Sequence, residues 1–140
     1  MWSWYIEDIN NPIIVLCYHD DIVGEVYAEN FESALFRHIL EFVSESNFYV
    51  SNGNTYQIDS DTAKKYILEW KSKFCKYFKP EWNDEIEKIL SLDLKYYKEI
   101  RLPKANYGYE VFLTPQESEQ LINKYLKFDK INTEVIWDIK

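Results

Sequence analysis

This sequence contains few of the residues on which most catalytic and metal sites are built. Its 140 residues include three glycines, two cysteines and two histidines. The glycines are isolated from one another, so no glycine-rich loop can hold a phosphate group. The cysteines and histidines do not occur at the spacings of a zinc site, and no nucleophile-elbow motif is present. We therefore expect no catalytic residue, no metal site and no cofactor.

Long apolar runs are also missing. No segment approaches the roughly 18 consecutive apolar residues that a membrane-spanning helix needs. The first residues include two acids and no base, unlike a secretory signal. Two cysteines without such a signal are more typical of reduced, buried thiols than of a disulfide. These features predict a cytoplasmic protein that does not contact a membrane.

The chain is instead rich in apolar, aromatic and acidic side chains. Hydrophobic residues make up 46% of it and aromatic residues 18%, a composition that argues against intrinsic disorder. A chain of 140 residues can bury a substantial core as one domain. We therefore expect a single domain over residues 1–140.

The negative charge is concentrated in the first part of the chain. Residues 1–61 contain 11 acids and one base, Arg37, a net charge of −10, whereas the remaining residues carry +2. Acidic surface repels nucleic acid and anionic membranes and attracts basic proteins. The charge therefore predicts a basic protein partner and no nucleic acid, although an acidic surface can also serve solubility alone.

A hairpin followed by a helix is the clearest structural prediction. Two segments rich in β-branched and aromatic residues, 12–18 and 22–28, flank a short turn, which is typical of antiparallel strands. Asn30 is a favoured capping residue, and it predicts the start of a helix over residues 31–44.

Weaker patterns complete the predicted fold. An Asn-Gly pair predicts a second hairpin over residues 47–58, and Ser60 or Asp61 is expected to cap the helix that follows. Thr114 and Glu117 have the spacing of a capping box. Helices are predicted over residues 61–77, 81–94 and 115–127, and further strands over residues 2–6, 107–113 and 133–139. This order predicts an α+β fold with helices packed on an antiparallel or mixed sheet.

Acidic and aromatic residues near the start of the chain are the candidate partner-binding surface. The acids in and beside the hairpin turn supply too few oxygen ligands for a calcium site. Tryptophan and tyrosine are favoured anchors at protein interfaces, although the same residues commonly fill a core. We expect a basic partner to bind Trp2, Trp4, Tyr18, Asp20, Asp21, Glu25 and Glu29.

Residues 12–43 resemble part of the SMI1/KNR4 (SUKH) superfamily. In that family a strand, a His/Asp-type turn and a second strand precede an Ala-Glu-Ser-Phe-Glu-x-x-Leu helix start. The matching residues are Pro12-Ile13-Ile14-Val15, His19-Asp20 and Ala28-Glu29-Asn30-Phe31-Glu32-Ser33-Ala34-Leu35. Asn30 stands where the pattern usually has serine and keeps the capping role. The family's N-terminal helix, its Leu-Pro-x-x-Tyr segment and its Gly-rich turn have no counterpart here.

The resemblance implies an intracellular bacterial protein that binds and neutralises a toxin, often a nuclease, without catalysis. Yeast members are linked to regulation of cell-wall synthesis, which implies a scaffold instead. Three functions therefore stay open: an immunity-type protein that neutralises a basic toxin, a regulatory or scaffold domain that forms a homodimer, and a small enzyme with a carboxylate-based site.

Overall fold

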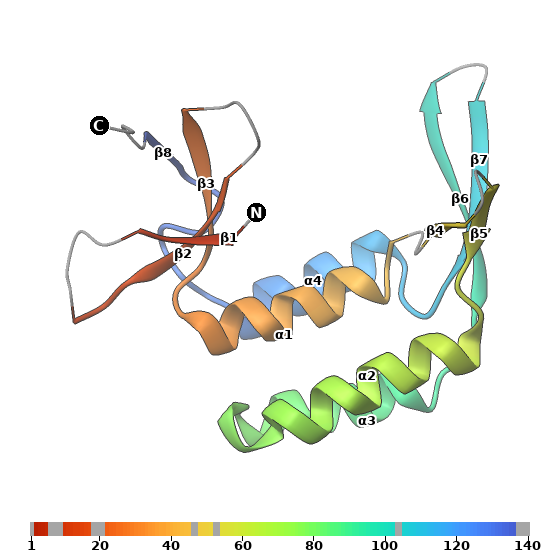
Figure 1. The fold of residues 1–140 in the computed structure, drawn as a ribbon, viewed down its shortest axis with the longest axis horizontal. Helices are drawn as coiled ribbons and strands as arrows, with labels where there is room; N and C mark the ends of the chain where they lie inside the picture. Colours follow the sequence, from red (N-terminus) through yellow and green to blue (C-terminus); the bar gives the residue numbers. More distant parts are fainter. Residues whose placement is uncertain are drawn as a thin grey trace. The chain divides into compact units, whose positions relative to one another are not determined.

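The computed structural model describes residues 2–5, 10–17, 22–45, 48–51, 54–102 and 105–136. These residues form four α-helices, one short 3-10 helix and eight strands (Figure 1). The chain divides into two compact units: the first comprises Met1–His38 and Ile122–Lys140, and the second comprises Ile39–Leu121. The predicted α+β class is confirmed, and all strand pairs described are antiparallel. The single domain stays a prediction.

A four-stranded antiparallel sheet is the framework of the first unit. Its strands are β1 (Trp2–Tyr5), β2 (Ile13–Cys17), β3 (Val23–Ala28) and β8 (Glu134–Ile136). They are arranged in the order β1-β2-β3-β8, so β1 and β8 are the outer strands among the described residues. β2 and β3 form the predicted hairpin, which is therefore confirmed.

Helix α1 (Phe31–Phe42) begins in the first unit directly after β3 and packs on the sheet. The Ser33 backbone N–H donates a hydrogen bond to the Asn30 side chain, with 2.8 Å between N and Oδ1, so the predicted N-cap is confirmed. The helix contributes Ala34 to the contact with the sheet. The core there consists of Ile14, Tyr27, Ala28 and Ala34, with Leu16 packed against it.

Arg37 joins α1 to two other parts of the first unit. Its Nη1 atom donates to the Tyr27 carbonyl oxygen at 2.8 Å and to Asn132 Oδ1 at 3.1 Å. The guanidinium carbon lies 4.3 Å from the centroid of the Tyr27 ring, which is a cation–π contact. Asn132 has a φ of 60°, and its backbone N–H donates to the Val26 carbonyl oxygen at 2.8 Å. Arg37 therefore fastens both the helix and the segment before β8 to β3.

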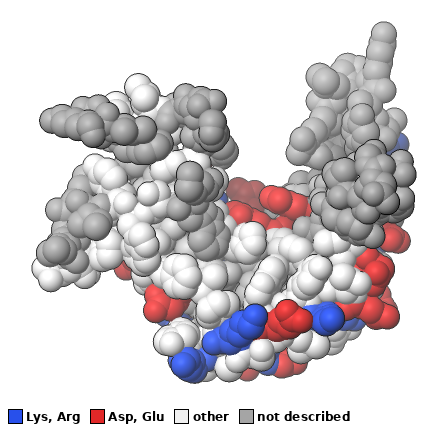
Figure 2. Space-filling view, viewed as in Figure 1, with Lys and Arg blue, Asp and Glu red and all other residues white. Residues whose placement is uncertain are grey.

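Helices and two hairpins make up the second unit. In it, α2 and α3 lie side by side (Figure 1), and an ion pair between Lys71 and Glu87 links them. Basic and acidic side chains alternate along this helical part, so its surface is of mixed sign (Figure 2). The elements are β4 (Phe48–Ser51), β5 (Asn54–Gln57), α2 (Ser60–Phe74), η1 (Cys75–Tyr77), α3 (Pro80–Leu90), β6 (Lys95–Leu102), β7 (Ala105–Val111) and α4 (Pro115–Tyr125), whose last residues belong to the first unit.

The end of α1 is tied into the second unit by its carbonyl groups. The backbone N–H groups of Phe112 and Leu113 both donate to the Val43 carbonyl oxygen, at 3.0 and 3.2 Å. The Ser118 hydroxyl, which is buried, donates to the Leu40 carbonyl oxygen at 2.9 Å. These bonds satisfy carbonyl groups that the end of a helix leaves without a partner in the helix.

One local prediction for the second unit is wrong, and one of its strands is not predicted. The cap of α2 is Asp59 rather than Ser60 or Asp61, because Asp59 Oδ1 accepts the Thr62 backbone N–H at 2.8 Å. The hydrogen bonds from Thr62 hold the pKa of Asp59 below its ordinary value.

The sequence pattern does not predict β6, because aromatic, charged and aliphatic residues follow one another along it without an apolar period.

Thr114 and Glu117 form the predicted capping box at the start of α4. The Thr114 N–H donates to Glu117 Oε2 at 2.6 Å, and the Glu117 N–H donates to Thr114 Oγ1 at 3.2 Å. Lys95 on β6 also forms an ion pair with Glu117. The hydrogen bonds from Lys95 and Thr114 hold the pKa of Glu117 below its ordinary value of 4.5.

Replacing Glu117 by Gln should remove a pH-dependent part of the stability. Because its pKa is lowered in the folded state, the Glu117 carboxylate stabilises the fold above its ordinary pKa of 4.5, and this contribution is lost as the pH falls through the folded-state value. Because solvent screens this partly exposed carboxylate, we expect E117Q to lower the free energy of unfolding by only about 0.5 kcal/mol near pH 7, and by much less near pH 3, in urea denaturation. The control is E119Q, which changes an exposed carboxylate of the same helix. Its effect on the free energy of unfolding should be the same near pH 7 and near pH 3. Equal losses for E117Q at both pH values would contradict this role.

Replacing Gly24 by Ala should destabilise the sheet of the first unit. A Cβ atom at Gly24 would lie 2.5 Å from Cγ1 of the buried Val15. We expect G24A to lower the free energy of unfolding by about 1–3 kcal/mol, the usual cost of overpacking. G108A is the control, because its Cβ would meet the far end of the exposed Tyr96 side chain, which can move away. If urea denaturation gave the same loss for both variants, steric crowding at Gly24 would not be the cause.

Candidate functional site

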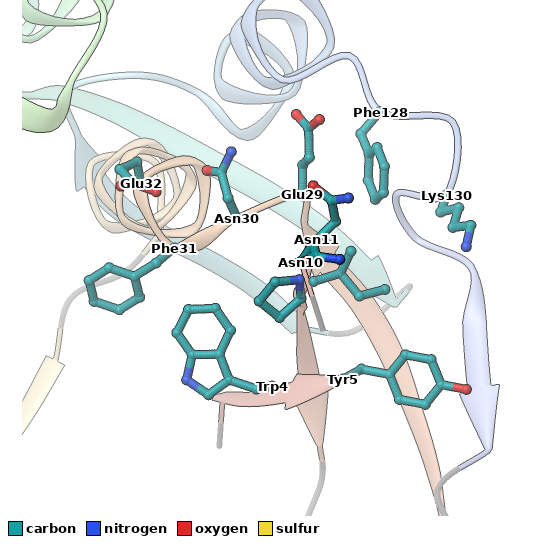
Figure 3. Close-up of a pocket in the computed structure, with 12 residues that line it drawn as sticks. Trp4, Tyr5, Asn10, Asn11, Glu29, Asn30, Phe31, Glu32, Phe128 and Lys130 are labelled. Carbon is teal, nitrogen blue, oxygen red and sulfur yellow. The ribbon is translucent and has the colours of Figure 1, made fainter. Parts of the chain in front are cut away.

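A pocket of about 560 Å³ lies in the first unit (Figure 3). Four segments contribute to its wall: β1, the residues that lead into β2, the start of α1 and the segment after α4. The lining combines aromatic rings, amide side chains and carboxylates. Its volume is within the roughly 300–1,000 Å³ that is typical of a ligand-binding site.

The start of α1 supplies one wall of the pocket. Glu29, Asn30, Phe31 and Glu32 are consecutive lining residues at the point where the chain leaves β3 and enters the helix. The cap at Asn30 fixes this change of direction. Glu32 lies in the first turn of α1, where the helix dipole stabilises a negative charge.

Two exposed aromatic rings form a second wall. Trp4 on β1 and Phe31 on α1 stack with their ring centroids 6.1 Å apart and their planes inclined by 27°. Figure 3 shows the two rings next to each other on one side of the pocket. Trp4 is 54% exposed and Phe31 41% exposed, so much of both rings faces solvent. Adjacent exposed apolar side chains commonly mark a binding surface.

Phe128 and Lys130 reach the pocket from a turn between α4 and β8. The Ile131 N–H donates to the Phe128 carbonyl oxygen at 3.0 Å, and the Thr133 N–H donates to the Lys130 carbonyl oxygen at 3.0 Å. The same turn contains Asn132, whose side chain accepts a hydrogen bond from Arg37. The contact of Arg37 therefore also positions this wall.

Carboxylates outnumber cations at the pocket. Glu29 and Glu32 line it together with one basic residue, Lys130. In Figure 3 the Glu29 carboxylate and the Lys130 ammonium point in different directions. Neither carboxylate forms an ion pair among the residues that the structure describes. The pocket can therefore offer negative charge beside an aromatic surface.

The structure brings together two of the predicted partner-binding residues. Trp4 and Glu29 both line the pocket. Glu25 does not; it lies on β3 opposite Glu134 of β8. The remaining predicted side chains, those of Trp2, Tyr18, Asp20 and Asp21, lie outside the described part of the chain.

Sequence patterns did not identify ten of the twelve residues that line the pocket, among them Phe31, Phe128 and Lys130. The helical period predicts that Phe31 faces the core, and this prediction is wrong because the ring is exposed. Its position directly after the N-cap is the available signal, since a side chain at the end of a helix need not face the core. Phe128 and Lys130 belong to no motif, and no feature of the sequence points to them.

The described residues contain no group of three His, Cys, Asp or Glu side chains that could hold a metal ion. None of the helices described is both long and apolar enough to cross a membrane. Cys17 is buried, but Cys75 is exposed, so the prediction of two buried thiols is wrong for Cys75; the two form no disulfide.

No protein-family model, curated protein or solved structure matches this chain.

Replacing Asn30 by Ala should destabilise the helix at the wall of the pocket. Alanine cannot accept the hydrogen bond from Ser33, so we expect N30A to lower the free energy of unfolding by about 1 kcal/mol. N30D keeps an acceptor at this position and should stay close to the unchanged protein. Urea denaturation of both variants is the measurement, and an equal loss for N30D would rule out a contribution from the cap.

Proposed function

We propose that this chain is a non-enzymatic binding protein that captures a basic protein partner with the acidic, aromatic surface of its first unit. The main support is the pocket, which combines Trp4 and Glu29 with a second exposed ring, that of Phe31. Aromatic anchors surrounded by polar and charged groups are the composition expected of a protein-binding surface.

The distribution of charge supports a basic partner. The first unit contains ten acids and five bases, a net charge of −5, and one of these bases, Arg37, bonds to Tyr27 and Asn132. An acidic surface of this kind accelerates the encounter with a basic protein and disfavours acidic ones. Electrostatic steering of this type decreases as the salt concentration rises.

The resemblance of residues 12–43 to the SMI1/KNR4 (SUKH) superfamily supports the immunity type of binding protein. In this proposal the partner is a basic toxin, for example a nuclease, whose substrate groove the acidic surface covers. In this proposal the protein acts in the cytoplasm. It needs no cofactor, because it covers the groove by binding and catalyses no reaction.

A second candidate function is self-association through the open edge of the sheet. Among the residues that the structure describes, β8 is an outer strand, and Ile136 on it is 71% exposed. An exposed outer strand is a template for pairing with a second chain. The protein would then be a regulatory or scaffold domain that forms a homodimer, and its association would be insensitive to salt.

Reversing the charge of the hairpin should slow capture of the partner. The partner is first isolated by a pull-down at low salt from lysate of the source cells and released by a salt step. We expect the triple variant D20K/D21K/E25K to associate with it roughly tenfold or more slowly, and with less dependence on salt, in surface plasmon resonance.

The matched control for this measurement is the variant E69K/D93K/E119K. It makes the same change in net charge at exposed positions of the second unit, and its association rate should stay closer to that of the unchanged protein. An unchanged rate for D20K/D21K/E25K would remove the hairpin from the interface. Recovery of only the protein itself, at any salt concentration, would favour the homodimer.

A further inference from the structure

We propose, on the basis of the proposed function, that the pocket of the first unit receives an arginine side chain of the basic partner. The pocket is lined by an aromatic wall, Trp4 and Phe31, and, elsewhere in its lining, by Glu29 and Glu32. In Figure 3 the Glu29 carboxylate points away from the two rings, so the apolar stem and the cation of a ligand would contact different parts of the lining. This combination matches the two parts of arginine, an apolar stem and a flat cation.

The aromatic wall favours arginine over lysine. A guanidinium is planar and weakly hydrated, and it stacks on aromatic faces while its methylene groups pack against them. Trp4 and Phe31 leave much of their ring surface open to such a contact. A lysine ammonium is a compact and strongly hydrated charge, so it loses more hydration on entering the same pocket.

The carboxylates favour a cation over an anion. A carboxylate can accept two parallel N–H bonds from one guanidinium. The positive end of α1 would attract an anion, but the Asn30 cap and Glu32 already occupy it. An anionic ligand would therefore meet two carboxylates and gain little from the helix, even with Lys130 at the wall.

The size of the pocket indicates that backbone next to the arginine enters as well. A volume of about 560 Å³ is larger than one side chain fills. Asn10 and Asn11 line the same pocket, and amide side chains can both donate to and accept from peptide groups. A short peptide is therefore a better probe than the free amino acid.

The test is the binding of acetyl-Gly-Arg-Gly-amide to the full chain, followed by NMR at the Trp4 indole N–H. Matched peptides carry lysine, glutamate or citrulline, the uncharged analogue of arginine, in the central position. We expect the arginine peptide to bind about tenfold or more tightly than the citrulline peptide, which cannot form the charge-assisted bonds. Equal affinity for citrulline, or tighter binding of the glutamate peptide, would overturn the proposal.

Substitutions of Trp4 and Glu29 test whether the arginine peptide contacts the aromatic and the acidic parts of the pocket. We expect W4A and E29Q each to weaken the arginine peptide by about tenfold, and W4F, which keeps a ring, to weaken it less. I136A and E134Q are matched controls, since they remove an exposed apolar side chain and an exposed carboxylate of β8, outside the pocket lining. Unchanged affinity in both W4A and E29Q would overturn the proposal.

The pull-down of the previous section separates this proposal from the proposed function. If E29Q and W4A still captured the basic partner at the rate of the unchanged protein and D20K/D21K/E25K did not, the arginine pocket would be wrong and the proposed function would stand. If the arginine peptide bound through Trp4 and Glu29 but no basic protein were captured, the pocket would stand and the proposed function would be wrong.

Discussion

The first unit depends on the contacts of one half-buried cation, Arg37. Its guanidinium bonds to the Tyr27 carbonyl oxygen and to Asn132, and it also lies over the Tyr27 ring. A hydrogen bond from a charged donor is stronger than one between neutral groups, and the cation–π contact adds to it. The turn that contains Asn132 also carries Phe128 and Lys130, so the same contact that fastens α1 to the sheet positions part of the pocket wall.

The first unit contains more acids than bases. It has ten acids and five bases, and four of the bases, Lys124, Lys127, Lys130 and Lys140, belong to residues 122–140. Repulsion within an excess of one sign of charge destabilises the compact state, although it favours solubility and directs association.

Those parts of the fold that depend on neighbouring residues could be predicted from the sequence. The β2–β3 hairpin, the cap at Asn30 and the capping box at Thr114 each involve residues a few positions apart, and all three are confirmed. β6 lacks an apolar period and becomes a strand only through its pairing with β7. The pocket could not be predicted as a site, because β1 and the turn at Phe128 come from opposite ends of the chain, and their meeting is set by tertiary contacts alone.

The pairing of β3 with β8 makes one end of the sheet the easiest to open. Glu25 and Glu134 occupy directly opposite positions on these strands, where two like charges repel each other. β8 spans three residues and, among the described residues, pairs with β3 alone. Backbone hydrogen bonds join Val26 to Asn132 and Thr133, directly before β8. Local separation from β3 is therefore limited to β8 itself. We therefore expect the amides of β8 to exchange with solvent through local opening at a lower free energy than those of β2.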